Sequence, residues 1–169
     1  GPVLNDNLGY YLGLYNTWSS YMPESDGIFI AYCSVYGNTE KAALALADKL
    51  KEKGCEKVVM SDLARSDNAE NVEDAFRYSK LVLASPTYNA DVFPFMKTFI
   101  EHLTERNFQN RTLAVIENGT WAPTAKRVIL AMLEKSKNLE ILPQSITIRS
   151  AMTEENRTQI AELAQALSK

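Results

Sequence analysis

From residue 28 onwards, short apolar runs alternate with segments in which apolar residues recur at helical spacing. The run that begins at Ile28 has the length and character of a strand buried on both faces of a sheet. In the next segment apolar residues recur from Ala43 to Leu50 at intervals of three and four, and Gly54 is typical of a helix end. By the same criteria, strands are expected at residues 28–33, 57–61, 80–85, 112–117 and 145–149, and helices at residues 39–53, 70–78, 93–105, 122–135 and 153–168.

This alternation predicts the fold class. Strand–helix–strand units with right-handed crossovers give a parallel sheet with helices on both faces. Five such units predict an α/β domain built on an open, doubly wound sheet of five parallel strands. Ligands of such sheets bind beyond the carboxyl ends of the strands, next to the point where the strand order reverses.

The first 27 residues differ in character from this domain. An apolar stripe predicts a helix within residues 4–22, although Gly9 and Gly13 each weaken it by roughly 1 kcal/mol relative to alanine. The stripe consists of Leu8, Tyr11, Leu12, Tyr15, Trp18 and Met22. It either packs against the domain that follows or docks to an upstream domain or another partner. We expect residues 1–27 to be a helical linker and residues 28–169 to be the globular domain.

Composition and charge exclude several classes of partner. The chain has 169 residues, 46% hydrophobic and 23% charged, which suits one domain with a single core. A formal net charge of −3, without a basic stripe, argues against nucleic acid. No apolar run approaches the roughly 18 residues that span a bilayer, so no membrane partner is expected.

The cysteines and the histidine give no signal for a disulfide or a metal site. Cys33 and Cys55 do not form a disulfide framework, which favours a reducing, cytoplasmic location. His102 is the single histidine, and no cluster of metal-ligating residues accompanies it. We expect His102 to be a surface or boundary residue.

The turn after the first strand is the main candidate for chemistry. It reads Ser34-Val35-Tyr36-Gly37-Asn38-Thr39 and leads directly into a predicted helix. Backbone N–H groups at a helix start point into one space, where the helix dipole favours an anion. Ser34 and Thr39 add hydroxyl donors, so we interpret the turn as a phosphate cradle, with an ordinary strand-to-helix turn as the alternative.

Other phosphate motifs are absent from this turn. Gly37 is its only glycine, which excludes the dinucleotide fingerprint, and no Gly-Lys-Ser/Thr follows, which excludes a P-loop. A thiol phosphatase would need Cys33 and an arginine that closes on the anion. Thr39 stands where that arginine is expected, which argues against this chemistry.

Two further loops follow the third and fourth strands and should reach the same edge of the sheet. They read Ser85-Pro86-Thr87-Tyr88-Asn89-Ala90-Asp91 and Glu117-Asn118-Gly119-Thr120-Trp121-Ala122. Each contains an aromatic ring, a hydroxyl and an amide side chain, a lining that suits a flat polar heterocycle attached to a phosphate. Alone, Tyr88 or Trp121 would be interpreted as an exposed loop aromatic. Three loops at one edge favour a ligand site.

At these residues the chain resembles a known family. The run from Ser34 to Thr39 is similar to the FMN-phosphate loop of flavodoxins. Tyr36, directly before Gly-Asn-Thr, resembles the flavodoxin-like domain of flavodiiron proteins, also called A-type flavoproteins. The run from Ser85 to Asn89, followed by Pro94, resembles the second flavin loop of that family.

Other segments also bear on this resemblance. Gly1-Pro2-Val3, with Tyr15 and Trp18 downstream, is similar to the segment that joins the family's metallo-β-lactamase-like diiron domain to its flavodoxin domain. The third loop departs from the family, which tends to have a glycine- and serine-rich run with an aromatic residue before Gly-Trp. Trp121 still stands in the place of the family tryptophan. The uninterrupted run from Leu139 to Arg149 leaves no room for the insertion of long-chain flavodoxins.

The resemblance implies a flavodoxin-like sheet with strand order 2-1-3-4-5 and FMN as the cofactor. It implies that electrons pass from a rubredoxin-type donor or a flavin reductase, through FMN, to a diiron centre in an upstream domain absent from this chain. It also implies a head-to-tail homodimer. The cofactor-binding residues that it implies are Ser34, Val35, Tyr36, Gly37, Asn38 and Thr39 around the phosphate, and Ser85, Pro86, Thr87, Tyr88, Asn89, Asn118, Gly119, Thr120 and Trp121 around the ring.

The predicted function is electron transfer through FMN in an oxygen or nitric oxide reductase, without turnover of either gas by this chain alone. Rival functions are a stand-alone flavodoxin, an NAD(P)H:quinone reductase-like enzyme and a flavin-free interaction domain. A receiver domain is disfavoured, because Cys33-Ser34 and Ser85-Pro86 stand where acidic residues would be needed. Glu117, at the end of the fourth strand, is expected either to face the flavin ring or to point into water or towards Arg111 or Arg149.

Overall fold

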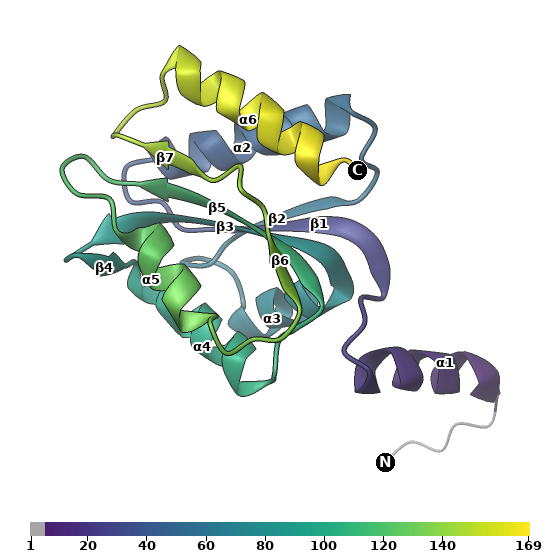
Figure 1. Cartoon of the computed structure of the whole chain (residues 1–169). Coiled ribbons are helices and arrows are strands. Elements are labelled where there is room, and N and C mark those ends of the chain that lie inside the picture. The colour runs from purple at the N-terminus through teal and green to yellow at the C-terminus, as the bar shows by residue number, and fades with distance from the viewer. Residues whose placement is uncertain (1–5) are drawn as a thin grey trace.

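The computed structural model describes residues 6–169, so Gly1-Pro2-Val3 and the start of the expected linker helix lie outside the described residues. Strands and helices alternate along the chain, as predicted (Figure 1). The helices are α1 Leu8–Ser19, α2 Asn38–Glu52, α3 Asn68–Arg77, α4 Pro94–Glu105, α5 Ala125–Met132 and α6 Glu154–Leu167. The strands are β1 Ser25–Tyr32, β2 Val58–Asp62, β3 Tyr78–Tyr88, β4 Asp91–Val92, β5 Arg111–Asn118, β6 Leu139–Ile141 and β7 Ile146–Ile148.

The sheet has the order β2-β1-β3-β5-β6, and all these neighbours run parallel. This confirms the expected order 2-1-3-4-5, because β5 is the fourth long strand and β6 occupies the place of the fifth. The short strand β4, which pairs antiparallel with the end of β3, is an addition that the sequence pattern did not predict.

The fifth strand is divided into two pieces instead of the single strand expected at residues 145–149. Both β6 and β7 pair with β5, but between Ile141 and Ile146 the edge strand has four residues where β5 has two. Pro143 lies in this interval and has no N–H group to offer to a ladder. The break therefore falls where the sequence cannot continue regular pairing.

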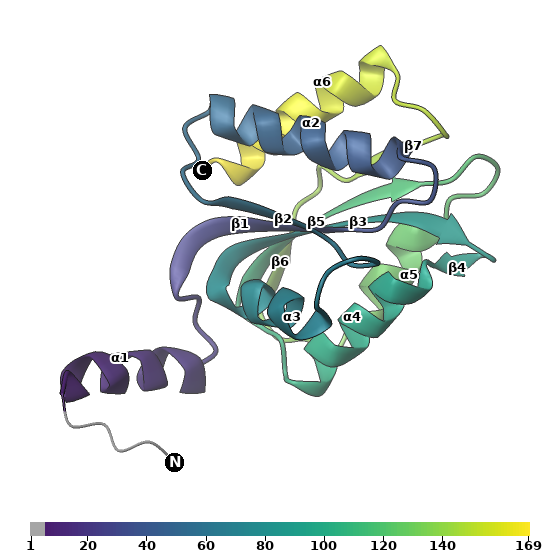
Figure 2. The same cartoon turned by 180° about the vertical axis from the view of Figure 1, so that it is seen from behind.

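Helices cover both faces of the sheet. α2 and α6 pack side by side on one face, and α3, α4 and α5 cover the other (Figure 1 and Figure 2). Consecutive strand residues alternate between two cores: Phe29 and Leu83 face α3, α4 and α5, whereas Ile30 and Val82 face α2 and α6. Because the central strands are buried on both faces, the loops at their carboxyl ends start from fixed positions.

Four of the five helices predicted after residue 28 are confirmed to within two residues at each end. α3 begins at Asn68 because the Asp67 carboxylate accepts the Ala69 N–H at 2.7 Å and caps the helix. α5 is the exception, since it occupies Ala125–Met132 and not residues 122–135. The residues before it belong to the third loop of the sheet edge.

The helix α1 is confirmed, but it does not pack against the domain. None of its residues is buried, and Tyr10 and Tyr15 are each 65% exposed. Figure 1 shows α1 standing away from the layered body. Its base is attached, because the Arg111 guanidinium donates to the Tyr21 carbonyl at 2.8 Å. The interpretation in which the apolar stripe packs against this domain is therefore wrong.

Within residues 6–169, no helix combines the length and the apolar character needed to cross a membrane. The same residues contain no group of three or more His, Cys, Asp or Glu side chains that could hold a metal ion. His102 lies in the last turn of α4 and is partly exposed, as expected for a surface or boundary residue. Its Nδ1 is 3.4 Å from the Glu105 carboxylate.

Candidate functional site

A cavity of about 510 Å³ lies beyond the carboxyl ends of β1, β3 and β5, where three loops meet. This volume is typical of a small-molecule or cofactor site. The first loop contributes Ser34, Val35, Tyr36, Asn38 and Thr39, the second Pro86, Thr87 and Tyr88, and the third Asn118, Gly119 and Thr120; Phe93, Pro94 and Ser150 complete the lining. The prediction that these three loops share one edge of the sheet is confirmed.

Some of the predicted site residues lie outside this lining. Gly37 shapes the first loop, since its φ of 82° is left-handed and suits glycine. Ser85 is buried beneath the second loop, where its hydroxyl donates to the Pro86 carbonyl at 3.0 Å. Asn89 lies in the turn between β3 and β4, and Trp121 is 94% exposed. Direct cofactor contacts of these side chains remain predictions.

The first loop offers unused hydrogen-bond donors. Gly37 is the N-cap of α2, and the Lys41 N–H donates to the Gly37 carbonyl at 3.0 Å as the first bond of the helix. The N–H groups just before Lys41 therefore have no acceptor within the helix and lie at the positive end of its dipole. The Ser34 hydroxyl is buried and has no hydrogen-bond partner among the described residues. Such a group calls for a ligand atom or an ordered water.

The second loop is a tight hairpin. Tyr88 pairs with Asp91, which leaves Asn89 and Ala90 as a two-residue turn with φ angles of 50° and 59°. Positive φ at both positions is characteristic of a type I′ turn, whose twist matches that of the flanking strands. Lys97 lies 2.8 Å from the Asp91 carboxylate, and this hydrogen bond lowers the pKa of Asp91.

Aromatic rings border the cavity on the side of the hairpin. Tyr88 and Phe93 pack edge to face with 5.6 Å between ring centroids, and Phe95 follows at 6.0 Å from Phe93. Phe93 was missed as a site residue, and Pro94 was named only as part of the resemblance to the second flavin loop, because the sequence pattern placed both in the first turn of α4. An aromatic residue directly before the proline that starts a helix at this edge is the signal that could have identified them.

The second and third loops are joined by hydrogen bonds. The Thr87 hydroxyl oxygen accepts the N–H groups of Thr124 at 3.0 Å and Ala125 at 3.2 Å, so it caps the start of α5 from a different strand. Gly119 packs so closely that a Cβ there would lie 2.9 Å from Pro123 Cα and 3.1 Å from the Thr87 hydroxyl. Glycine at this position is required by space.

Glu117 does not face the cavity, so the expectation that it approaches the flavin ring is wrong. Its side chain is buried, and its carboxylate accepts the Lys126 N–H at 2.9 Å and the Thr147 hydroxyl at 2.8 Å. Side chains alternate along a strand, and Glu117 falls on the face covered by α5. The carboxylate lies at the positive end of α5, so the alternative in which Glu117 points into water or towards Arg111 or Arg149 is wrong as well.

Asn118 points to the opposite face and binds a residue that was not predicted. Its side-chain N–H donates to the Ser150 carbonyl at 3.0 Å, and its side-chain oxygen accepts the Ser150 N–H at 3.1 Å. Ser150 follows β7 and lines the cavity. The signal was available, because Ser150 comes directly after a predicted strand end, but only the loops after strands one, three and four were considered.

Comparison with known proteins identifies the family. Residues 29–164 match the family described as flavodoxin domain. The chain belongs to the flavodoxin domain family. This flavodoxin domain is similar to a nitric oxide reductase of Moorella thermoacetica, with 25% identity over 137 residues that cover 81% of this chain and 34% of the relative. It is also similar to an anaerobic nitric oxide reductase flavorubredoxin of Escherichia coli, with 28% identity over 123 residues, 72% of this chain and 26% of the relative. The chain thus spans about a third or less of these curated relatives.

Solved structures share the fold of this flavodoxin domain. The flavodiiron protein from Giardia intestinalis superposes with a TM-score of 0.86 at 23% identity, over 97% of this chain and 40% of that chain. The rubredoxin oxygen:oxidoreductase from Desulfovibrio gigas gives a TM-score of 0.84 at 17% identity, over 96% and 40%. A flavodoxin from the domain Archaea gives 0.72 at 16% identity, over 84% of this chain and 96% of that chain.

FMN is the cofactor that membership of this family indicates, and the cavity fits it. The unpartnered Ser34 hydroxyl and the free N–H groups before Lys41 match the oxygen atoms of a phosphate. The wall formed by Tyr88 and Phe93 matches the apolar faces of a planar ring. No lysine or arginine belongs to the lining described above, so the site would hold phosphate through neutral donors.

Cys33 lies beneath the first loop and is unsuited to thiolate chemistry. Its side chain is fully buried, and this burial raises the pKa of the thiol to about 12. Burial is the largest cause of this raised pKa, and the negative charge of Asp62 contributes in the same direction. A thiol in this state is protonated at neutral pH, so the phosphatase alternative lacks its nucleophile.

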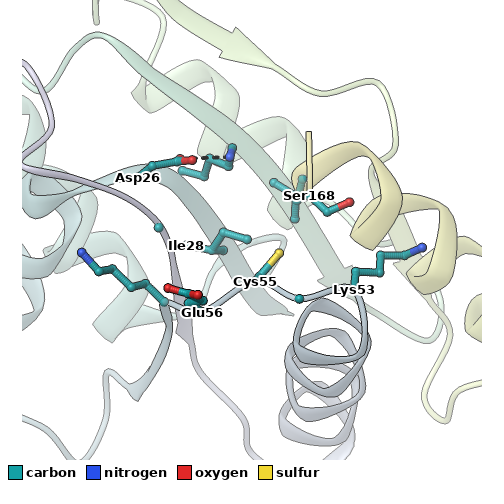
Figure 3. Close-up of a pocket in the computed structure, with 11 residues that line it drawn as sticks. Asp26, Ile28, Lys53, Cys55, Glu56 and Ser168 are labelled. Atoms are coloured by element: carbon teal, nitrogen blue, oxygen red, sulfur yellow. Dashed lines mark hydrogen bonds and ion pairs between the residues drawn. The ribbon is translucent and has the colours of Figure 1, made fainter.

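A second cavity, of about 410 Å³, lies at the opposite end of the sheet (Figure 3). Three lysines line it, but each has a partner of its own. Lys80 lies 3.1 Å from the Asp26 carboxylate, and Lys53 bonds to Gln165 at 2.6 Å on the outer side. Lys57 donates to a serine hydroxyl at 3.0 Å. The lysines of the cavity in Figure 3 thus have partners, whereas the first site contains the Ser34 hydroxyl without a partner among the described residues.

Proposed function

We propose that this flavodoxin domain binds FMN and relays electrons within an oxygen or nitric oxide reductase whose diiron centre lies in an upstream domain. The observation that carries the proposal is the first loop, which leads into α2 and in which the buried Ser34 hydroxyl has no partner in the described part of the chain. The names of the similar proteins support the reductase: a nitric oxide reductase, a flavorubredoxin, a flavodiiron protein and a rubredoxin oxygen:oxidoreductase. The reductase activity belongs to the longer protein in this proposal.

Each loop has a separate task in this proposal. The N–H groups and hydroxyls of the first loop bind the FMN phosphate, and the other two loops hold the ring and exclude water from one side of it. FMN supplies electron-transfer chemistry when bound, and the chain supplies position and electrostatics. The residues assigned to these tasks are Ser34, Val35, Tyr36, Gly37, Asn38 and Thr39 for the phosphate, and Ser85, Pro86, Thr87, Tyr88, Asn89, Asn118, Gly119, Thr120 and Trp121 for the ring.

Residues 1–27 form the joint to the upstream domain in this proposal. α1 carries no charged residue, and none of its side chains is buried. A helix that is apolar on several faces and unburied calls for a covering surface. The extent of the structural matches supports the same conclusion, because the flavodiiron protein matches 97% of this chain and the free-standing flavodoxin matches 84%.

The proposed partners follow from the same relatives. The electron donor is a rubredoxin-type protein or a flavin reductase, which the names flavorubredoxin and rubredoxin oxygen:oxidoreductase support. The longer protein forms a homodimer in this proposal. Both cysteines are free thiols, which supports a reducing compartment, the cytoplasm.

Titration of the purified chain with FMN and with riboflavin tests the proposal, with quenching of flavin fluorescence as the signal. We expect equimolar binding of FMN and much weaker binding of riboflavin, because the phosphate contributes most of the polar contacts. Equal affinities would contradict the phosphate cradle, and no binding of either flavin would favour a flavin-free interaction domain. Hydride transfer from NAD(P)H to the loaded chain would instead support a quinone reductase.

Iron analysis with turnover assays tests whether the diiron centre lies in the upstream domain and not in this chain. We expect no iron-dependent reduction of oxygen or nitric oxide by this chain, since residues 6–169 contain no cluster of metal-ligating side chains. Stoichiometric iron with iron-dependent turnover would overturn the assignment of the diiron centre to another domain.

A further inference from the structure

The connection between β7 and α6 supplies a cavity wall that lies outside the three predicted loops. It brings Ser150 to the cavity beside the end of β5, with which β7 pairs (Figure 1). Ser150 has a φ of 72°, a left-handed conformation that residues with a Cβ rarely adopt. Such conformations persist where the surroundings impose them, and they concentrate at ligand-binding sites.

Asn118 bonds to the backbone of Ser150 in this conformation. Its amide makes a reciprocal pair with Ser150, donating to the carbonyl at 3.0 Å and accepting the N–H at 3.1 Å. The pair uses both ends of the amide on a single residue, and it satisfies both backbone groups of Ser150. The Ser150 hydroxyl is then the polar group that this residue retains for a ligand.

The pair is not needed to attach β7 to the sheet, because other bonds do so. The Gly119 N–H donates to the Ile148 carbonyl at 2.9 Å. The Asn156 side chain donates to the Thr147 carbonyl at 3.2 Å and also completes the capping box of α6. What the Asn118 pair adds is the placement of Ser150 at the cavity.

We propose that Asn118 is a positioning residue which holds Ser150 as a fourth contact of FMN, with the Ser150 hydroxyl bonding to a polar atom of the cofactor. This inference rests on the proposed function and adds a binding loop to it. Asn118 acts on FMN through Ser150 in this proposal, since its side-chain oxygen and one of its two amide N–H donors are already bonded to Ser150. Direct contact of the Asn118 amide with the ring is the competing arrangement.

A double-mutant cycle tests this arrangement, with the variants Asn118→Ala, Ser150→Gly and the two combined. Glycine tolerates the left-handed conformation, so Ser150→Gly removes the hydroxyl without disturbing the backbone. Asn156→Ala is the matched control, because it removes another buried asparagine, which bonds to the backbone of β7 at Thr147 but lies outside the cavity lining. The readouts are the dissociation constant for FMN, the visible circular dichroism of the bound flavin and the melting temperature of the flavin-free chain.

We expect Asn118→Ala to weaken FMN binding about tenfold and Ser150→Gly to weaken it several-fold. The combined variant should bind no more weakly than Asn118→Ala, because both changes remove one interaction. Both single variants should alter the flavin dichroism, whereas Asn156→Ala should lower the melting temperature and leave the dissociation constant unchanged.

Three results would overturn the inference. Unchanged FMN affinity in Ser150→Gly would show that its hydroxyl is not a contact, and this variant at an exposed position tests the point even if Asn118→Ala does not fold. Additive losses in the combined variant would show that Asn118 touches FMN directly. Failure of the unchanged chain to bind FMN would instead overturn the proposed function, and this inference with it.

Discussion

Two ends of this molecule, the carboxyl edge of the sheet and the helix α1, each leave groups without a binding partner, but the groups are of opposite kinds. At the carboxyl edge of the sheet, loops far apart in sequence are tied together by hydrogen bonds, and the cavity lining includes the Ser34 hydroxyl, a buried polar group without a partner among residues 6–169. On α1, no residue is buried, and the groups left exposed are apolar side chains such as Tyr10 and Tyr15. The first end is prepared for a small polar ligand, and the second for the surface of another protein domain.

The forces that would complete each end differ accordingly. A ligand in the cavity gains directional bonds from groups that the fold already holds in place. A domain that covers α1 gains from the removal of apolar surface from water, at about 25 cal/mol per Å². Aromatic side chains offer about 150–250 Å² each, and α1 exposes four of them by 41–65%. The exposed aromatic area is therefore roughly 340–560 Å², a little over half of what one partner contributes to a standard interface.

The largest effect on the free energy of unfolding is expected from a thiol. Cys33 lies at the carboxyl end of the strands, and Cys55, at their amino end, serves as the comparison. Burial raises the pKa of the Cys33 thiol from its ordinary value of 9.0 to about 12. A raised pKa in the folded state means that the free energy of unfolding is unaffected below pH 9 and falls as pH rises towards about 12, by up to about 4 kcal/mol. Urea unfolding across this range measures the loss.

The variant Cys33→Ala should remove this alkaline loss, whereas Cys55→Ser should keep it, because Cys55 is only partly buried. Cys55 should also react with a thiol reagent in the native protein while Cys33 does not. If Cys33→Ala lost as much free energy of unfolding at alkaline pH as the unchanged chain, water would have to reach the thiol beneath the first loop.

Alanine substitutions at two glycines, Gly119 in the third loop and Gly13 in α1, compare the sheet edge with the helix directly. At Gly119 a Cβ would lie 2.9 Å from Pro123 Cα, so Gly119→Ala should destabilise the fold by about 1–3 kcal/mol and weaken FMN binding. At Gly13 a Cβ meets nothing within 4 Å, so Gly13→Ala should stabilise α1 by about 1 kcal/mol. Urea unfolding and helical circular dichroism check both changes. Equal effects of the two substitutions would contradict the contrast between a packed loop and an open helix.

Sequence reasoning succeeded where the structure is local and failed where it depends on distant residues. The alternation of strands and helices, four of the five helices predicted after residue 28, and the first loop follow from periodicity and from a turn of consecutive residues, whereas the strand order was implied by the resemblance to flavodoxins. The third loop depends on Thr87, which bonds to residues 37 and 38 positions away. The cavity wall at Ser150 depends on Asn118, which is 32 positions away. Neither pairing leaves a periodic signal. The expected start of α5 was wrong for the same reason, because tertiary bonds define it.

A smaller effect is expected at Thr39, which is 2% exposed and lines the cavity. Thr39→Ala should weaken FMN binding by about 1–3 kcal/mol, since a buried donor to a charged group is lost. Thr98→Ala, on the exposed side of α4, is the control and should leave the affinity unchanged. The affinity for riboflavin should hardly change in either variant. A loss that is equal for both flavins would place Thr39 against the ring and not the phosphate.

The smallest effect is expected on α1 itself. Leu12→Gln and Tyr15→Gln keep good or acceptable helix formers and remove exposed apolar groups, so together they should change the free energy of unfolding of this chain by less than about 0.5 kcal/mol. Phe99→Ala in the core, measured in the same way, should cost about 3–5 kcal/mol. Destabilisation by the α1 variants approaching that of Phe99→Ala would show that the helix is held against this domain in solution. In a longer protein that includes the upstream domain, the same two substitutions should lower the melting temperature, because the surface that they alter would there be buried.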